Sequence, residues 1–384
     1  MHVAIVTETY PPEVNGVALT VRNMESGLRR AGCRTTLVRP KQPSDAHAEA
    51  SLEHTLVRGA RLPRYPGLQF GWPSGRRLRR LWQAQRPDVA YVATEGPLGW
   101  SALRQANAMR IPVVAGFHTR FDEYMTRYGF PYLAPVAWRW MRAFHNRAQR
   151  TLVPTDALRR ELLDGGFHQV SVLGRAVDGE RFHPRLRESG LRRAWGLDDR
   201  ALAICHVGRI APEKNLDLLV AAFDAIQARH ADARMVWIGD GPSRGELQRR
   251  HPDHVFCGVQ RGEALAAHLA STDLFLFPSV TETFGNVTLE AMASGVATVA
   301  FDYGAAGTCM RHDESGVLVP MEQPDLFVSE SVRAASDPAL RTRISANARQ
   351  VAGSLRPEVI TRQLIDILEE VCHGQDADTA LASH

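Results

Sequence analysis

Short buried runs of β-branched and aromatic residues alternate with segments of helical periodicity along almost the whole chain. The first run, HVAIVTE at residues 2–8, leads through a loop of proline, asparagine and glycine into a helical segment at 17–32. The same order repeats with the runs TTLVRP, DVAYVAT, PVVAGFH and RTLVPT and the helical segments 76–86, 97–110 and 134–149. This alternation predicts a parallel sheet that is covered by helices on both faces.

A second series of strands begins after the loop-like stretch GRAVDGERFHPRLRESG. It contains LAICHVGRI, RMVWIGDG, VFCGV, DLFLFPS and ATVAFD, each leading toward a helix. A chain of 384 residues also exceeds the usual size of a single core. We therefore expect two doubly wound domains, at residues 1–175 and 190–352. A final helix at about 356–372 can pack against either domain, and residues 373–384 are expected to form a mobile tail.

The composition is that of a soluble globular protein, with 44% hydrophobic and 23% charged residues. No apolar stretch reaches the roughly 18 residues that span a bilayer, and the amino terminus lacks the features of a signal peptide. The five cysteines are scattered, without a metal-binding or disulfide pattern. We expect a cytoplasmic protein with reduced thiols.

The two halves of the chain differ in charge. Lys and Arg outnumber Asp and Glu by 25 to 15 in residues 1–180, whereas acidic residues outnumber basic ones by 27 to 21 in the remainder. This asymmetry suggests that the first half faces an anionic partner, either a nucleic acid or a membrane surface.

The stretch TETFGNVTLEAMASG, residues 281–295, follows an apolar strand and starts a helix. Its residues Phe284, Gly285 and Asn286 lie at the expected helix N-terminus, where free N–H groups favour an anion such as a diphosphate. Glu282 and Glu290, on either side of this bend, can accept hydrogen bonds from sugar hydroxyls. The alternative is that Glu282 is an ordinary loop carboxylate and Glu290 a solvated helix residue.

The stretch VGRIAPEKNLDLLV, residues 207–220, places Arg209 after a strand and Lys214 near a helix start. Both cations can converge on one phosphate. The alternative is a surface loop with salt bridges. Lysine is rare in this chain, because only Lys41 and Lys214 occur beside 44 arginines.

Two further positions belong to the first half. Gly16 lies in the turn after the first strand and allows a ligand to approach the backbone, although the G-x-G-x-x-G spacing is absent there. His118 ends a buried strand, where a side chain can point into a ligand site; a capping or partly buried histidine is the alternative. The GDGPSRG stretch at 239–245 is interpreted as a strand-to-helix turn.

Two segments combine arginine with aromatic residues. One is PSGRRLRRLWQAQRP, with Arg76, Arg77, Arg79 and Arg80, and the other is WRWMRAFHNRAQR. Helices of this kind can lie on anionic lipid, with the arginines at the headgroups. The alternative is a core-packed helix with a solvated arginine face.

Taken together and in this order, the NGV turn, FHT, VGRIAPEKN, GDGP and TETFGNVTLEAMASG resemble the retaining glycosyltransferase family 4. The motifs span most of the chain. The resemblance implies the α/β GT-B architecture, in which two Rossmann-like, doubly wound parallel-sheet domains face each other across a cleft and the final helix crosses back to the first domain.

The resemblance also implies roles for the residues named above. Arg209 and Lys214 match the cations that hold the donor diphosphate, and Glu282 and Glu290 match the paired acids near the donor sugar and the ribose. Further donor contacts are implied for His118, for Gly16, and for the backbone groups of Phe284, Gly285, Asn286 and Val287. The implied chemistry passes through an oxocarbenium-like state without a protein nucleophile and without a metal or other cofactor. The only D-x-D sequence is DAD in the tail.

Within the family, the chain looks most like mannosyltransferases that use GDP-mannose and glycolipid synthases that use a UDP-sugar. The basic first half and the arginine/aromatic segments favour a membrane-lipid acceptor such as diacylglycerol over a soluble or polysaccharide acceptor, and therefore a peripheral location on the inner face of the membrane. The stretch GRAVDGERFHP departs from the family's usual Asn-Gly-Val-Asp pattern, which leaves the contribution of Asp178 open.

Other functions remain as alternatives at this point. A GT-B epimerase or phosphorylase would share the fold, but Lys214 lies in the wrong context for a pyridoxal-bearing lysine. A non-catalytic nucleotide-sugar sensor would not require all of Arg209, Lys214, Glu282 and Glu290. Nucleic-acid binding would explain the basic half and not these residues.

Overall fold

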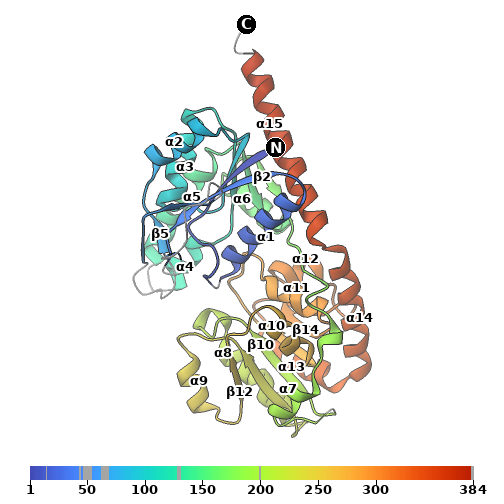
Figure 1. Cartoon of the computed structure of the whole chain (residues 1–384). Coiled ribbons are helices and arrows are strands. Elements are labelled where there is room, and N and C mark those ends of the chain that lie inside the picture. Colours follow the sequence, from blue (N-terminus) through green and yellow to red (C-terminus); the bar gives the residue numbers. More distant parts are fainter. Residues whose placement is uncertain are drawn as a thin grey trace. The chain divides into compact units, whose positions relative to one another are not determined.

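The computed structural model describes residues 1–13, 15–42, 45, 54–61, 69–127, 131–198 and 200–381 (Figure 1). The described residues form two compact units. The first comprises Met1–Gly174 and Pro357–His384, and the second comprises Arg175–Arg356. The loop-like stretch that follows Gly174 therefore belongs to the second unit, and the chain returns to the first unit at Pro357.

The main sheet of the first unit contains seven strands among the described residues, in the order β3-β2-β1-β6-β7-β8-β9. Every neighbouring pair is parallel. The order reverses between β1 and β6, which is the position where open α/β sheets bind ligands. The strands are β1 His2–Val6, β2 Arg34–Pro40, β3 His54–Val57, β6 Val89–Val92, β7 Val113–Gly116, β8 Arg150–Val153 and β9 Val170–Val172; β4 Gly59–Arg61 and β5 Gln69–Gly71 form a separate antiparallel pair.

Helices cover both faces of this sheet. Successive side chains of β1 enter opposite hydrophobic clusters, Ala4 and Val6 on one face and Val3 and Ile5 on the other. Helices α2, α3 and α5 pack on the first face, and α1 and α15 on the second. The helices are α1 Gly16–Arg30, α2 Gly75–Ala84, α3 Pro97–Ala108, α4 Phe121–Arg127, η2 Pro131–Leu133, α5 Ala134–His145, α6 Asp156–Asp164 and α15 Pro357–Leu381.

The long helix α15, red in Figure 1, packs alongside α1. The two helices approach closely at Gly27, because a Cβ at this position would collide with Thr361 Oγ1. The sequence pattern predicted a helix that ends near residue 372, but the helix continues to Leu381. No proline interrupts residues 373–381, and alanine and glutamine there are good helix formers.

The second unit repeats the architecture. Its sheet contains six strands among the described residues, all parallel, in the order β12-β11-β10-β13-β14-β15. The strands are β10 Ala203–Val207, β11 Arg234–Ile238, β12 Val255–Gly258, β13 Leu274–Phe277, β14 Ala297–Phe301 and β15 Val317–Val319. Its order reverses between β10 and β13, so the loops that follow these two strands lie at the expected ligand-binding position.

Two hydrophobic clusters lie on the two faces of this second sheet. Helices α10, α11 and α14 contribute to one cluster, and α8, α9, α13 and the first part of α14 to the other. The helices are η3 Pro184–Leu186, α7 Ser189–Ala194, η4 Pro212–Lys214, α8 Leu216–Gln227, α9 Arg244–Arg250, α10 Gly262–Ala270, α11 Asn286–Ala293, α12 Gly304–Cys309, α13 Pro324–Ser336 and α14 Pro338–Ser354.

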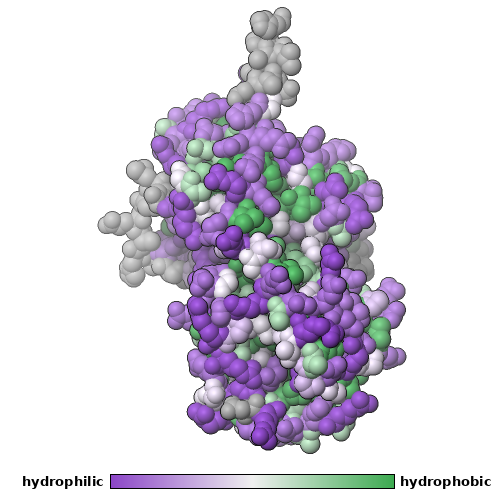
Figure 2. Space-filling view, turned by 90° about the vertical axis from the view of Figure 1, so that its right-hand side faces the viewer, coloured by the Kyte–Doolittle hydropathy of each residue, from purple (hydrophilic) through white to green (hydrophobic). Residues whose placement is uncertain are grey.

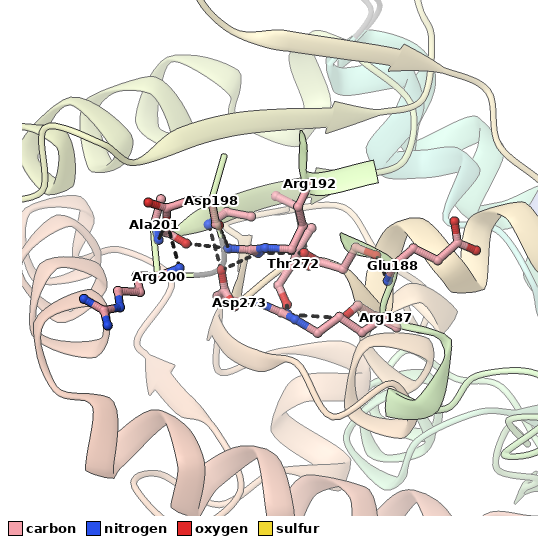
Figure 3. A network of polar contacts seen from close by, with 12 residues as sticks. Arg187, Glu188, Arg192, Asp198, Arg200, Ala201, Thr272 and Asp273 are labelled. Atoms are coloured by element: carbon pink, nitrogen blue, oxygen red, sulfur yellow. Dashed lines mark hydrogen bonds and ion pairs between the residues drawn. The ribbon is translucent and has the colours of Figure 1, made fainter. Parts of the chain in front are cut away.

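A buried polar network joins α7 to the amino-terminal edge of this sheet (Figure 3). Arg192 is 1% exposed. Its guanidinium pairs with Asp273 at 3.0 Å and donates to the carbonyls of Asp198 and Ala201. Asp273 also accepts from the backbone N–H of Ala203, the first residue of β10, at 2.8 Å. The network therefore ties the segment before β10 to the start of β13, at the edge opposite the strand ends.

No helix within the described ranges is long and apolar enough to cross a membrane. On the face shown in Figure 2, hydrophilic residues predominate and interrupt the hydrophobic areas.

Candidate functional site

The loops that follow β10 and β13 carry the cations and the first of the paired acids. The two strands are neighbours in the sheet. Arg209 and Lys214 follow the end of β10 at Val207, and Glu282 follows the end of β13 at Phe277. Since the strands are parallel, both loops leave the same edge of the sheet, as expected from the sequence.

The backbone of the loop after β10 rests on the GDGP turn after β11. The N–H of Gly208 donates to the carbonyl of Ile238 at 3.0 Å, and that of Ile210 donates to the carbonyl of Asp240 at 2.9 Å. Gly239 has a φ of 151°, and a Cβ there would collide with the carbonyl oxygen of Gly208. The GDGP motif is therefore a support for the cation-bearing loop.

Lys214 and Glu282 contact each other directly. The Lys214 ammonium donates to Glu282 Oε1 and to the hydroxyl of Ser279, the latter at 3.3 Å. Ser279 donates to the same Glu282 oxygen at 2.7 Å. The side chains of Lys214 and Glu282 are 15% and 16% exposed, so water reaches this pair only in part. The Lys214 ammonium and the Glu282 carboxylate thus form an ion pair beside the ends of β10 and β13.

Arg209 lies on the same loop and forms an ion pair with Glu213, with 3.5 Å between Nη1 and Oε1. The Arg209 side chain is 40% exposed, whereas that of Glu213 is 6% exposed. The Arg209 guanidinium therefore remains accessible to an anion.

Helix α11 begins close to Glu282 in the sequence, with Gly285 as its N-cap in the left-handed conformation at a φ of 91°. The first turn contains no acidic side chain, and Gly285 offers no side chain to cap it. The carbonyl of Phe284 accepts from the N–H of Ala305 at 2.6 Å, which fixes the turn against the start of α12. The N–H groups of the first turn, at Asn286 and Val287, make this helix end suitable for an anion.

Glu290 lies one turn into α11 and is partly buried. Burial raises the pKa of Glu290 to about 7, and the positive charge of Arg181 opposes this rise. The carboxyl group is therefore poised to exchange its proton near neutral pH, and a hydroxyl that donates to it would favour the ionised form.

Two predicted positions, His118 and Gly16, lie in the first unit. His118 follows β7, is 9% exposed and contacts the hydroxyl of Tyr91 through Nε2 at 2.9 Å. Gly116 leaves room for this contact, since a Cβ there would collide with both side chains. Gly16 is the first residue of α1, and a Cβ there would meet no atom of the described residues within 4 Å. The surface above Gly16 is therefore open.

Four acidic or hydroxyl residues near these strand ends were not predicted from the sequence. Glu213 lies within the quoted APEKN stretch, and Ser279 directly follows the strand DLFLF and its proline, so the position of each could have drawn attention. In the first unit, Glu8 follows β1 and Glu95 follows β6, and burial raises their pKa values to about 7 and about 8. Glu8 accepts from the N–H of Leu98 at 2.8 Å and thereby caps α3.

The predicted membrane arginines lie on α2. Arg76, Arg77, Arg79 and Arg80 are exposed, while Leu78 and Trp82 are each 1% exposed and pack into the first unit. The helix is thus core-packed with an arginine-rich outer face, and this geometry is compatible with both interpretations of the segment.

Two family profiles match the chain, Glycosyltransferase Family 4 over residues 14–181 and Glycosyl transferases group 1 over residues 201–337. The chain is 34% identical over 376 residues to a GDP-mannose-dependent alpha-mannosyltransferase of Mycobacterium tuberculosis (strain CDC 1551 / Oshkosh), a match that covers 97% of each chain. The chain belongs to glycosyltransferase family 4. It is therefore a hexosyltransferase that uses a nucleotide-sugar donor.

A second relative of the same organism is a GDP-mannose-dependent alpha-(1-6)-phosphatidylinositol monomannoside mannosyltransferase. It is 26% identical over 394 residues, which cover 98% of this chain and 99% of that protein. Among solved structures, Anabaena Alr3699/HepE in complex with UDP and glucose superimposes with a TM-score of 0.76 at 18% identity, covering 96% of this chain and 100% of that chain. These findings confirm the predicted GT-B fold, the family and the enzyme class.

Proposed function

We propose that this family 4 enzyme transfers mannose from GDP-mannose to a lipid-linked acceptor, with retention of configuration and without a metal ion. The observation that carries the choice of donor is the 34% identity, over 97% of each chain, to a GDP-mannose-dependent alpha-mannosyltransferase. The set of residues at the strand ends of the second unit is compatible with such a donor, because it combines cations, a helix N-terminus and acceptor carboxylates.

The donor diphosphate of this proposal lies between the two cations and the start of α11. Negative charge grows on the leaving diphosphate as the bond to the anomeric carbon breaks. Arg209, Lys214 and the N–H groups of Asn286 and Val287 stabilise that charge. Glu282 accepts from hydroxyls of the mannose, and Glu290 accepts from hydroxyls of the ribose. For Gly16 and His118, the family resemblance supports contacts to the diphosphate and the sugar.

The cations take the place that a divalent metal holds in other diphosphate sites. Two side-chain charges and a helix N-terminus offer donors with fixed direction to the phosphate oxygens. Transfer should therefore continue in the presence of EDTA. An activity that is lost in EDTA and restored by Mg²⁺ or Mn²⁺ would contradict this part of the proposal.

The acceptor is proposed from the surface of the first unit. Two of the four exposed arginines of α2, Arg76 and Arg77, line a hollow of about 500 Å³ together with Val57, Arg58, Trp72, Pro73, Ser74 and Gly75. Trp72 is 53% exposed, and Trp140 on α5 is 50% exposed. Guanidinium groups bind phosphate headgroups, and exposed tryptophans favour the membrane interface. The name of the second relative, which contains phosphatidylinositol monomannoside, supports the same acceptor class.

A donor panel tests the choice of nucleotide sugar. The purified protein is heated with GDP-mannose, UDP-glucose, UDP-glucuronate or ADP-glucose, and the unfolding temperature is recorded. A donor that binds only the folded state raises this temperature. We expect the largest rise, and transfer to lipid extracts, with GDP-mannose. A rise confined to a UDP-sugar would support instead a UDP-dependent glycolipid synthase, the other candidate raised by the sequence.

Vesicle flotation tests the lipid surface. The variant Arg76→Ser/Arg77→Ser/Arg79→Ser/Arg80→Ser should lose its partition into vesicles that contain phosphatidylglycerol. The control replaces four exposed arginines of the second unit by serine and changes the net charge by the same amount: Arg193, Arg200, Arg249 and Arg250. Equal partition of the α2 variant and the unsubstituted protein would remove the membrane claim.

A further inference from the structure

A buried carboxylate accompanies the exposed guanidinium of the donor site. Glu213 follows Pro212 in the short helix η4, is 7% exposed as a residue, and pairs with Arg209 four positions earlier. Glu213 belongs neither to the paired acids nor to the cations identified in the sequence.

Arg209 needs a side-chain partner to keep one direction. Its side chain is long and 40% exposed, and holding such a side chain in one rotamer costs conformational entropy. Lys214 has its own partners, Glu282 and Ser279. Within the part of the chain that the structure describes, Glu213 is the charged partner of Arg209.

The position of Glu213 is itself fixed by the backbone. The N–H of Lys214 donates to the carbonyl of Ala211 at 3.0 Å, and Asn215 closes the turn in the left-handed conformation at a φ of 56°. Upstream, Ile210 is held by the turn after β11, through its hydrogen bond to Asp240. The Glu213 side chain is 6% exposed on this fixed turn. Its carboxylate is therefore preorganised and can direct the more mobile guanidinium.

We propose that Glu213 is a positioning residue, which directs the Arg209 guanidinium toward the diphosphate of the donor. The inference rests on the proposed function and adds a residue to the same site. A carboxylate on one side of the guanidinium leaves its other N–H groups available to phosphate oxygens, because the planar group presents five donors.

This role predicts that a substitution of Glu213 lowers kcat and leaves the affinity for the donor nearly unchanged. Replacing Glu213 by glutamine removes one negative charge beside the phosphate site, so donor binding is not weakened by charge. The guanidinium loses its fixed direction, however, and misplacement of a charged group by about 1 Å can cost about 100-fold in rate. We expect Glu213→Gln to lower kcat by about 10- to 100-fold while the Kd for GDP-mannose stays within about threefold.

A double-mutant cycle tests whether Glu213 acts through Arg209. The variants are Glu213→Gln, Arg209→Ala and the combination, and kcat and the Kd for GDP-mannose are measured for each. If the two residues act as a unit, Glu213→Gln lowers kcat when Arg209 is present and adds no further loss to that of Arg209→Ala. An equal loss with and without the Arg209 side chain, or no loss in either case, overturns the proposal.

Two control variants test how specific the effect is to the charge of Glu213. Glu246→Gln, at an exposed position on α9 of the same unit, should leave kcat unchanged. Glu213→Asp retains the charge on a shorter side chain, and its kcat should lie between those of Glu213→Gln and the unsubstituted enzyme; a kcat as low as that of Glu213→Gln contradicts a role of the charge. If Arg209→Ala alone keeps full activity, the donor site of the proposed function is wrong, an outcome distinct from failure of the cycle.

Discussion

At the scale of single residues, Lys214, Glu282 and Ser279 form one small unit. Lys214 and Ser279 both donate to the same oxygen of Glu282. A phosphate that attracts the Lys214 ammonium would free part of this oxygen for a sugar hydroxyl, while Ser279 keeps the carboxylate in place. Binding of the diphosphate and binding of the sugar would then support each other.

The first prediction concerns the two charged members. Lys214→Ala and Glu282→Ala should each lower kcat about 100- to 1,000-fold, because each removes a group that the proposed function places against the leaving diphosphate or the sugar. Circular dichroism should show an unchanged fold. Ser279→Ala removes one neutral hydroxyl that donates to Glu282 and should lower kcat by about tenfold or less. Full activity of either charged variant would discard the site assignment.

The second prediction concerns pH and Glu290. Its pKa of about 7 in the free protein lies above the ordinary value, so the carboxyl group carries a proton below pH 7. Ribose hydroxyls that donate to the carboxylate favour its ionised form, so binding below pH 7 must release this proton. The affinity for GDP-mannose should rise with pH, by up to about tenfold per unit, and level off above pH 7.

Calorimetry of GDP-mannose binding measures this dependence. The pH is varied from about two units below the pKa of Glu290 to about one unit above it. Glu290→Gln has no proton to release and should bind with an affinity that changes little over the range. A pH dependence that persists unchanged in Glu290→Gln would assign the titration to another group, and the role of Glu290 at the ribose would lose its support.

The sheet edge at which the candidate residues lie could be predicted from sequence, because strand ends and helix starts have recognisable signatures. The contacts between them could not. Nothing in the spacing says that Lys214 meets Glu282 across 68 positions or that Glu213 turns toward Arg209 instead. Such pairings depend on side-chain directions that the fold sets.

At the scale of elements, the turn after β11 determines the shape of the loop after β10. Gly239 adopts a φ of 151°, which residues other than glycine rarely adopt. A Cβ at this position would also collide with the carbonyl of Gly208. The loop that carries Arg209 and Lys214 therefore depends on a glycine outside it.

The third prediction tests this dependence. Gly239→Ala should cost about 1–3 kcal/mol of stability from backbone strain alone. It should also weaken donor binding, because the cation-bearing loop must move to relieve the collision with Gly208. Gly245→Ala on α9 is the control, since a Cβ at Gly245 meets no described atom within 4 Å. Chemical denaturation and GDP-mannose binding measure both effects; equal behaviour of the two variants would contradict the supporting role.

The fourth prediction concerns the network of Arg192 at the opposite edge of the sheet (Figure 3). Arg192→Ala leaves the carbonyls of Asp198 and Ala201 without their buried donor, while Asp273 keeps its ion pair with Arg187 at 2.7 Å. The substitution should therefore lower the free energy of unfolding by about 1–3 kcal/mol. The protein that remains folded should bind GDP-mannose as before, since the proposed donor residues lie at the other ends of the strands. A larger Kd for GDP-mannose at a temperature where the variant is folded would mean that the network affects the residues at the opposite edge of the sheet.

Elements with strong periodicity were predictable, and short or atypical ones were not. The long buried runs indicated the main strands of both sheets, whereas β4 and β5 have three residues each and no pattern that separates them from a loop. The end of α15 was placed too early because its last residues are polar, although polar residues such as glutamine form helices readily.

At the scale of the whole molecule, two units with separate sheets and separate hydrophobic clusters divide the known motifs between them. The Glycosyltransferase Family 4 profile ends in the first residues of the second unit, and the Glycosyl transferases group 1 profile lies entirely within that unit. Repetition of the strand and helix pattern predicted two domains, because the length of the chain and the periodicity of its segments can both be read from a single sequence. The acceptor leaves no comparable pattern, so it must be argued from surface chemistry.

The charge distribution gives the last prediction. If the excess of ten basic residues in positions 1–180 draws the protein to a membrane, the attraction is electrostatic and salt must weaken it. The Debye length falls from about 10 Å at 0.1 M to about 3 Å at 1 M salt. Partition into phosphatidylglycerol vesicles should therefore fall steeply over this range, and partition into phosphatidylcholine vesicles should be low throughout. Binding that resists salt and ignores lipid charge would mean that apolar contacts such as Trp72 dominate, and that the arginines of α2 only keep that helix solvated.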